Sequence, residues 1–188
     1  MKDREKILRY FSATGEEAKD MAVRLLDIAD SVDRGRPFAV GPFMSPFAAQ
    51  VGQTIAAHIK TVAVKTSGGY HEAERIRVAF ARNDYDGPVD FGLTALKVTW
   101  DDRYRLIGHR DVLGALMGLG IDRAVLGDIL MQGAGCQIVA DSSMAEWLKR
   151  NFLKVAMVSV QIKEISLEEL EPPKKTAREV RATVASLR

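Results

Sequence analysis

The chain has 188 residues, of which 47% are hydrophobic and 28% charged, and its formal net charge is +2. This length and hydrophobic content are enough for two small lobes, each with its own core. The weak net charge excludes proteins that bind nucleic acid through a uniformly basic surface, although basic residues do cluster locally. An ordinary solvated surface is the simpler interpretation of any one such cluster.

The sequence carries no sign of a membrane anchor or of a metal site. No apolar run is long enough to span a membrane, and no apolar stretch follows the basic N-terminus as it does in a secretory signal. We therefore expect a cytoplasmic protein with no membrane partner. A single cysteine, Cys136, cannot form an internal disulfide, and the three histidines show no metal-ligand spacing. We expect no cofactor.

The first lobe, residues 1–86, is predicted to be α/β. Its helices should bury apolar stripes, and one of these comprises Phe47, Val51, Ile55 and Ile59. The expected elements are a helix over 3–11, a helix opened by a capping box at Thr14–Glu17 and ended at Gly35, an extended piece over 38–40, a helix started by Ser45-Pro46, and strands over 61–66 and 76–81.

The second lobe, residues 87–167, follows a segment rich in turn-forming residues at 83–88. Its expected elements are a strand over 91–100, a helix over 110–119, strands over 126–131 and 136–140, a helix from a capping box at Ser143–Glu146 through Asn151, and a long strand over 155–165. This β-α-β-β-α-β order predicts a ferredoxin-like, RNA-recognition-motif-like lobe, so that the fold class is α+β. The central strand 136–140 has no aromatic residue for stacking bases, which makes RNA stacking on the sheet doubtful.

Residues 168–188 are predicted to form a linker. The segment is charged and is interrupted by Pro172-Pro173, which cannot continue a helix. Residues 183–188 look like the opening of a further folded element.

Ser67-Gly68-Gly69-Tyr70 with Arg75 and Arg77 is the most suggestive local pattern. A double glycine lets the backbone approach a phosphate, a tyrosine can stack on a base, and two arginines at i and i+2 share one face of a strand. An ordinary turn with a packed tyrosine explains the pattern equally well.

Catalytic signatures are lacking, and we expect no enzyme. No serine is flanked as a nucleophile elbow, and Cys136 lies in an apolar strand, where thiols are usually inert. Three carboxylates, Asp111, Asp122 and Asp128, lie near Arg110 and Arg123. The favoured interpretation is a structural set of ion pairs that orients a turn.

Together these residues resemble the YlmH family. The most specific part is His109–Arg123, continuing to Ile129; supporting matches are Gly68-Gly69-Tyr70 with Ala73–Arg75, and Thr183–Arg188. The resemblance implies a non-catalytic protein that binds ribosomal RNA and tRNA on the large ribosomal subunit in the rescue of stalled translation, with a link to cell division. It also implies a C-terminal RNA-binding domain after the linker, so we expect this chain to be a truncated form.

The RNA contacts are expected from the glycine-tyrosine turn, two nearby arginines, and the arginines around the helix-strand junction. These candidates are Gly68, Gly69, Tyr70, Arg75, Arg77, His109, Arg110 and Arg123. One alternative is a protein-interaction module that docks a ribosomal or division protein without RNA contact. Another is an RNA-modifying or nucleotide-using enzyme, for which the sequence offers no acid, base and nucleophile set.

Overall fold

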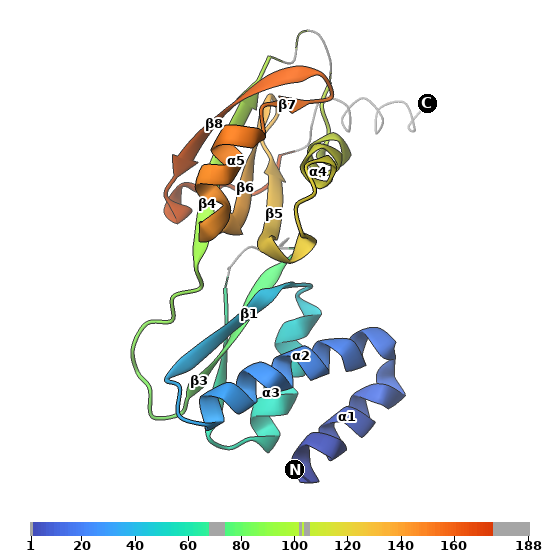
Figure 1. Cartoon of the computed structure of the whole chain (residues 1–188), viewed down its shortest axis with the longest axis vertical. Coiled ribbons are helices and arrows are strands. Elements are labelled where there is room, and N and C mark those ends of the chain that lie inside the picture. The colour runs from blue at the N-terminus through green and yellow to red at the C-terminus, as the bar shows by residue number, and fades with distance from the viewer. Residues whose placement is uncertain (1, 68–73, 102, 104–105, 175–188) are drawn as a thin grey trace. The chain divides into compact units, whose positions relative to one another are not determined.

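The computed structural model describes residues 2–67, 74–101, 103 and 106–174. The chain divides into two compact units, Met1–Phe91 and Gly92–Arg188. Each unit combines helices with one sheet (Figure 1), which confirms the predicted α+β class. The boundary expected between residues 86 and 87 lies within the segment that joins the last strand of the first unit to the first strand of the second.

The first unit packs two helices, α2 and α3, against one face of an antiparallel sheet of strand order β1-β3-β2, and α1 packs on these helices. Its core joins Leu25 and Ala29 of one helix to Ile55 of another and to Val78 and Phe80 of the central strand. Its elements are α1 (Lys2–Thr14), α2 (Glu16–Asp33), β1 (Phe38–Met44), α3 (Phe47–His58), β2 (Val62–Thr66) and β3 (Ile76–Arg82). Figure 1 shows α1, α2 and α3 as the helical layer of this unit.

Two local predictions for the first unit are wrong. Thr14 does not open α2, because it is the last residue of α1, where its hydroxyl donates to the carbonyl of Tyr10 at 3.2 Å. Gly15 caps α2 instead, with a φ of 144° that a residue with a side chain rarely adopts. Phe47, the first residue of α3, is 38% exposed and is not part of the buried stripe, whereas Val51 and Ile55 of the same helix are buried.

The helix-free face of the first sheet is covered by residues 83–91, which we call the first strap. Register places Phe38 opposite Ala81 and Phe43 opposite Arg77 on this face. The Tyr85 ring lies 5.8 Å from the Phe38 ring, and Nη1 of Arg77 donates to the carbonyl of Phe91 at 2.6 Å. The strap therefore encloses the central strand from the second side, and β3 is buried at every position except Arg82.

The second unit has the predicted ferredoxin-like core. Its antiparallel strands follow the order β5-β6-β4-β8-β7, and Leu96 and Ile138 of the sheet pack with Val112, Leu116 and Leu148 of two helices on one face. Its elements are β4 (Leu93–Trp100), α4 (His109–Gly118), η1 (Arg123–Val125), β5 (Leu126–Met131), β6 (Gly135–Asp141), η2 (Ser142–Met144), α5 (Ala145–Asn151), β7 (Lys154–Val155), β8 (Val158–Ile165) and η3 (Leu167–Glu169).

Two local predictions for the second unit are also wrong. The long strand over 155–165 is a hairpin, because Ala156 and Met157 adopt φ values of 49° and 70° and turn the chain between β7 and β8. Ser143 does not cap the following helix. Asp141 caps the short turn before it, since its carboxylate accepts from the backbone amide of Ser143 at 2.9 Å and from its hydroxyl at 2.6 Å.

Residues 166–174, which we call the second strap, cross the helix-free face of the second sheet. The side-chain amide of Gln137 donates to the carbonyl of Glu169 at 3.1 Å and accepts from the amide of Glu171 at 2.8 Å. Beyond these bonds, the amide of Lys174 donates to the carbonyl of Met131 at 2.7 Å. The first part of the predicted linker is therefore packed on the sheet, because hydrogen bonds to β5 and β6 satisfy its backbone.

Candidate nucleic-acid interface

Arg75 and Arg77 meet around Phe43, whereas Gly68, Gly69 and Tyr70 lie outside the described residues. Nη2 of Arg75 donates to the Phe43 carbonyl at 2.5 Å, and the Arg77 guanidinium lies 4.5 Å from the centre of the Phe43 ring. Arg77 is only 8% exposed. The two arginines thus brace the end of β1, and the burial of Arg77 argues against direct RNA contact by this residue.

Arg75 also lines an open cavity of about 550 Å³ between α2 and the end of β1. The cavity has mixed charge, because Glu17, Asp20 and Arg24 line it together with Arg75. Two carboxylates at its wall oppose the approach of a phosphate. Arg75 can reach solvent here, but its surroundings do not make a strongly anion-attracting site.

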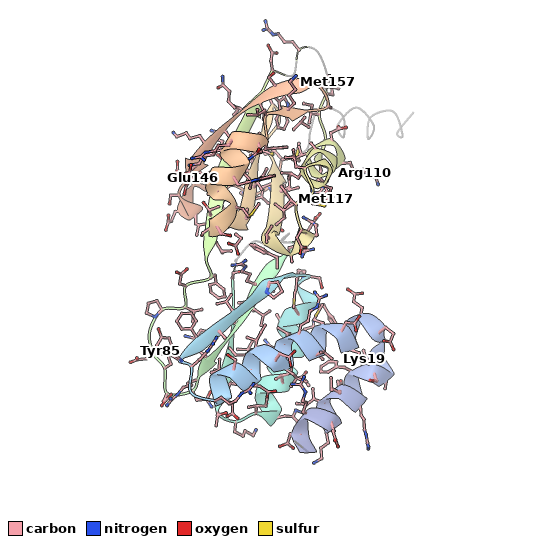
Figure 2. All side chains as sticks on the ribbon, viewed as in Figure 1. Lys19, Tyr85, Arg110, Met117, Glu146 and Met157 are labelled. Carbon is pink, nitrogen blue, oxygen red and sulfur yellow. The ribbon has the colours of Figure 1, made fainter. Side chains whose placement is uncertain are left out.

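His109 and Arg110 occupy the first turn of α4, and Arg123 opens η1 in the same unit. Figure 2 shows the Arg110 side chain pointing outward from α4, consistent with its exposure. Asp111 accepts from the amide of Gly108 at 2.8 Å, and Asp122 accepts from the amide of Ala124 at 2.9 Å. These carboxylates therefore cap backbone turns, a structural role that leaves the exposed Arg110 accessible to a ligand.

The uncovered half of the second sheet presents a polar surface that the sequence analysis missed. On the helix-free face, Lys97 of β4 lies opposite Lys163 of β8, and Thr99 lies opposite Gln161. All four residues are exposed, and Ser159 extends the surface along β8. We call these five residues the β4–β8 surface. Strict alternation of apolar and polar residues in 96–100 and 158–163 could have revealed it, because alternating side chains point to opposite faces.

A groove of about 220 Å³ lies between this surface and the second strap. Lys97, Thr99 and Gln137 line it from the sheet, and Glu171 and Lys174 line it from the strap. A hydrogen bond from Lys174, 2.5 Å long, lowers the pKa of Glu171, and the charge of Lys97 lowers it further. The groove is therefore polar on both walls and remains charged at neutral pH.

The basic residues Lys149, Arg150 and Lys154, at and just after the end of α5, form a cluster whose charge is partly neutralised. Lys149 pairs with Glu146 and, at 3.3 Å, with Glu164, and hydrogen bonds to these two carboxylates raise the pKa of Lys149. Arg150 and Lys154 are exposed. The net positive charge of this cluster is consequently smaller than the sequence indicates.

The described residues offer little for catalysis. Burial raises the pKa of the Cys136 thiol far above its usual range, so the thiol stays protonated and unreactive. Within the ranges that the structure describes, no three histidine, cysteine or acidic side chains gather into a metal site. In the same ranges, no helix has both the length and the apolar character needed to cross a bilayer.

The fold and this surface define a class: a two-unit α+β protein whose ferredoxin-like second unit exposes half of its sheet. Two family models match the chain over adjacent segments. Residues 17–85 match the N-terminal model of YlmH, and residues 87–169 match the model described as "Putative RNA-binding domain in YlmH". The chain belongs to the YlmH family.

One curated relative and one solved structure agree with this membership. The relative is "Ribosome-associated protein quality control protein P2" of Bacillus subtilis (strain 168), with 33% identity over 129 residues, which is 68% of this chain. The match covers 50% of that relative, so the chain spans about half of its length. The structure is "Cell division protein ylmH from Streptococcus pneumoniae", with a TM-score of 0.72 and 19% identity, covering 84% of this chain and 96% of that one. At this identity the structure supports the fold alone.

Proposed function

We propose that this chain is a non-catalytic, cytoplasmic protein that binds ribosomal RNA and tRNA on the large ribosomal subunit during the rescue of stalled translation. The observation that carries the proposal is the match of residues 87–169, nearly all of the described second unit, to a model described as an RNA-binding domain. The name of the Bacillus relative, which places that protein with the ribosome, supports the ribosomal context. A link to cell division, which the name of the streptococcal protein contains, is part of the same proposal.

The proposed contacts are charge-assisted hydrogen bonds to the phosphate backbone. Exposed Arg110, together with other exposed polar and basic residues of the second unit, supplies the donors, and no covalent bond is formed or broken. Binding through phosphates releases counterions, so affinity must fall as salt rises.

Co-sedimentation with purified large ribosomal subunits across a salt series tests this function. We expect binding at low salt that weakens steadily as salt increases. The absence of binding at every salt concentration would contradict the proposal. Arg110→Ala should weaken binding, whereas Arg36→Ala, an exposed arginine before β1, serves as the matched control.

A protein-docking module is the second candidate, and exposed apolar side chains favour it. Trp147, Leu153 and Met157 of the second unit are 38%, 57% and 83% exposed. Exposed apolar residues mark protein contacts when they form one continuous patch, so this candidate requires that these three residues act together. Binding to subunits that is unchanged by salt, but is lost in Met157→Asp with Leu153→Asp, would favour docking to a protein over docking to RNA.

A further inference from the structure

We infer that the β4–β8 surface holds the phosphate backbone of single-stranded RNA in a sequence-tolerant way. The inference rests on the proposed function and adds the face, the residues and the kind of contact. Its starting point is the pairing of Lys97 and Lys163, which lie directly opposite each other in the register of β4 and β8.

Like charges at directly opposed positions of an antiparallel pair destabilise the sheet. Both lysines are exposed, and neither forms an ion pair with a residue that the structure describes. The charge of Glu171 on the second strap favours Lys97, but Glu171 forms its ion pair with Lys174, so neither Lys97 nor Lys163 has an ion pair with a described residue that offsets the repulsion. A bound polyanion would convert the repulsion into two favourable contacts.

The neighbouring side chains fit a phosphate and sugar backbone. Thr99 and Gln161 lie opposite each other next to the lysine pair, and Ser159 follows along β8. Hydroxyl and amide groups donate hydrogen bonds to phosphate and ribose oxygens. None of these exposed residues is aromatic, so the surface cannot read bases by stacking.

The second strap sets the limit of the surface. Gln137, only 4% exposed, binds the strap backbone at Glu169 and Glu171, so the strap occupies the sheet over β6 and β5. A strand of RNA on this face is thereby directed along β4 and β8. The groove beside the strap, lined by Lys97, Thr99 and Lys174, borders one side of the surface along which the RNA would lie.

The test uses the full chain and fluorescein-labelled oligouridine of about twelve nucleotides, a length within the usual range of single-strand sites. Anisotropy titrations over a salt series compare the wild type with Lys97→Gln/Lys163→Gln. Each single-strand phosphate contact contributes about 0.7 to the salt slope, so the slope should fall by about 1.4 and the affinity roughly 25-fold in 0.1 M salt. Oligoadenosine should bind much as oligouridine does, because no base is read.

The matched control is Lys6→Gln/Arg9→Gln, which removes the same charge from exposed positions on α1. It should bind like the wild type. Equal weakening in both double variants would mean a net-charge effect and would overturn the inference.

The remaining outcomes separate the inference from the proposed function. If the wild type binds large subunits but not oligouridine, or if Lys97→Gln/Lys163→Gln binds both normally, the β4–β8 surface is not the RNA site and the proposed function stands. If the wild type binds neither, both ideas fail. The free energy of unfolding, measured in urea, should be the same in Lys97→Gln/Lys163→Gln as in the wild type or slightly higher, since a like-charge pair is removed.

Discussion

In both units a segment of chain covers the helix-free face of the sheet, but the two sheets differ in width. In each unit helices cover one face of the sheet and the chain that follows the last strand crosses the other face, where a buried polar side chain of the sheet bonds to the strap. In the first unit this is Arg77 of β3, and in the second it is Gln137 of β6. The first sheet has three strands and its central strand is enclosed, whereas the second has five strands and its strap leaves Lys97 and Thr99 of β4 and the polar residues of β8 exposed. Sheet width relative to the strap thus decides which face is free to bind.

Arg77 and Gln137, which we call the strap anchors, also differ in chemistry. Arg77 combines a charged donor, bonded to a backbone carbonyl, with an aromatic face below its guanidinium. Gln137 uses a neutral amide that both donates and accepts, as a backbone group would. Hydrogen bonds from charged groups contribute more than neutral ones, so the first anchor should stabilise its unit more strongly.

Replacing the first anchor should therefore have the largest effect. Arg77→Ala removes the hydrogen bond to Phe91 and the contact with the Phe43 ring, and we expect a loss of about 2–4 kcal/mol in the free energy of unfolding. Urea unfolding followed by circular dichroism measures it. Both tryptophans, Trp100 and Trp147, belong to the second unit, so their fluorescence reports that unit separately.

The control for this variant is Arg36→Ala, whose exposed side chain should contribute within about 0.5 kcal/mol of zero. A loss below about 1 kcal/mol in Arg77→Ala would show that the first strap is not held by this arginine.

Replacing the second anchor should have an intermediate effect. Gln137→Leu leaves the carbonyl of Glu169 and the amide of Glu171 without their side-chain partner, and we expect a loss of about 2 kcal/mol. Tryptophan fluorescence in urea measures the stability, and hydrogen exchange of the Glu171 amide should become faster. Gln161→Leu makes the same chemical change at an exposed position of the same face and should leave both readouts unchanged.

Two glycines of the second unit test local backbone effects of about 1 kcal/mol. A methyl group added at Gly114 of α4 meets nothing within 4 Å, so Gly114→Ala should stabilise the unit, because glycine weakens a helix interior. Gly120 has a φ of 77°, so Gly120→Ala should destabilise it by a similar amount. Thermal unfolding of the two variants should shift in opposite directions. A destabilising Gly114→Ala would indicate that something else packs on this face of α4.

The smallest effect concerns pH. Lys174 lowers the pKa of Glu171 by hydrogen bonding and by charge, so the ionised carboxylate is favoured in the folded strap. The contribution of this pair to strap docking is therefore complete above the unfolded carboxyl pKa and is lost as pH falls through the lower folded value. The carboxylate is exposed, so the gain is small and screened by salt. An NMR titration of Glu171 should show a higher pKa in Lys174→Gln than in the wild type. An unchanged pKa would show that Lys174 and Glu171 do not form an ion pair.

Sequence reasoning predicted the element order of the second unit because its helical and alternating periodicities differ clearly. It failed where two local signals competed. Thr14 has the sequence signature of a cap, yet α1 extends to include it and Gly15 makes the turn. In the strand expected over 155–165, the alternating pattern of 158–165 follows the apolar Val155 with no glycine, proline or asparagine between them, so no turn signal marked the hairpin at Ala156-Met157.

The candidate site was only partly predictable. The spacing of Arg75 and Arg77 predicted two arginines on one face of a strand, but Arg75 precedes β3, and spacing does not reveal that the ring of Phe43, more than thirty positions earlier, packs against the Arg77 guanidinium. The lysine pair at 97 and 163 was not predicted, because only the pairing of β4 with β8 brings these positions together.

The sequence by itself determined the α+β class, the ferredoxin-like order and the family resemblance, because these depend on periodicity and motif, which are local along the chain. Only the tertiary structure decided which polar residues are anchors and which are exposed. Arg77 and Lys97 are both basic residues in strands, yet one is enclosed by a strap and the other faces solvent. That distinction depends on strand register and on where the following chain crosses the sheet, and both are set by contacts between residues far apart in sequence.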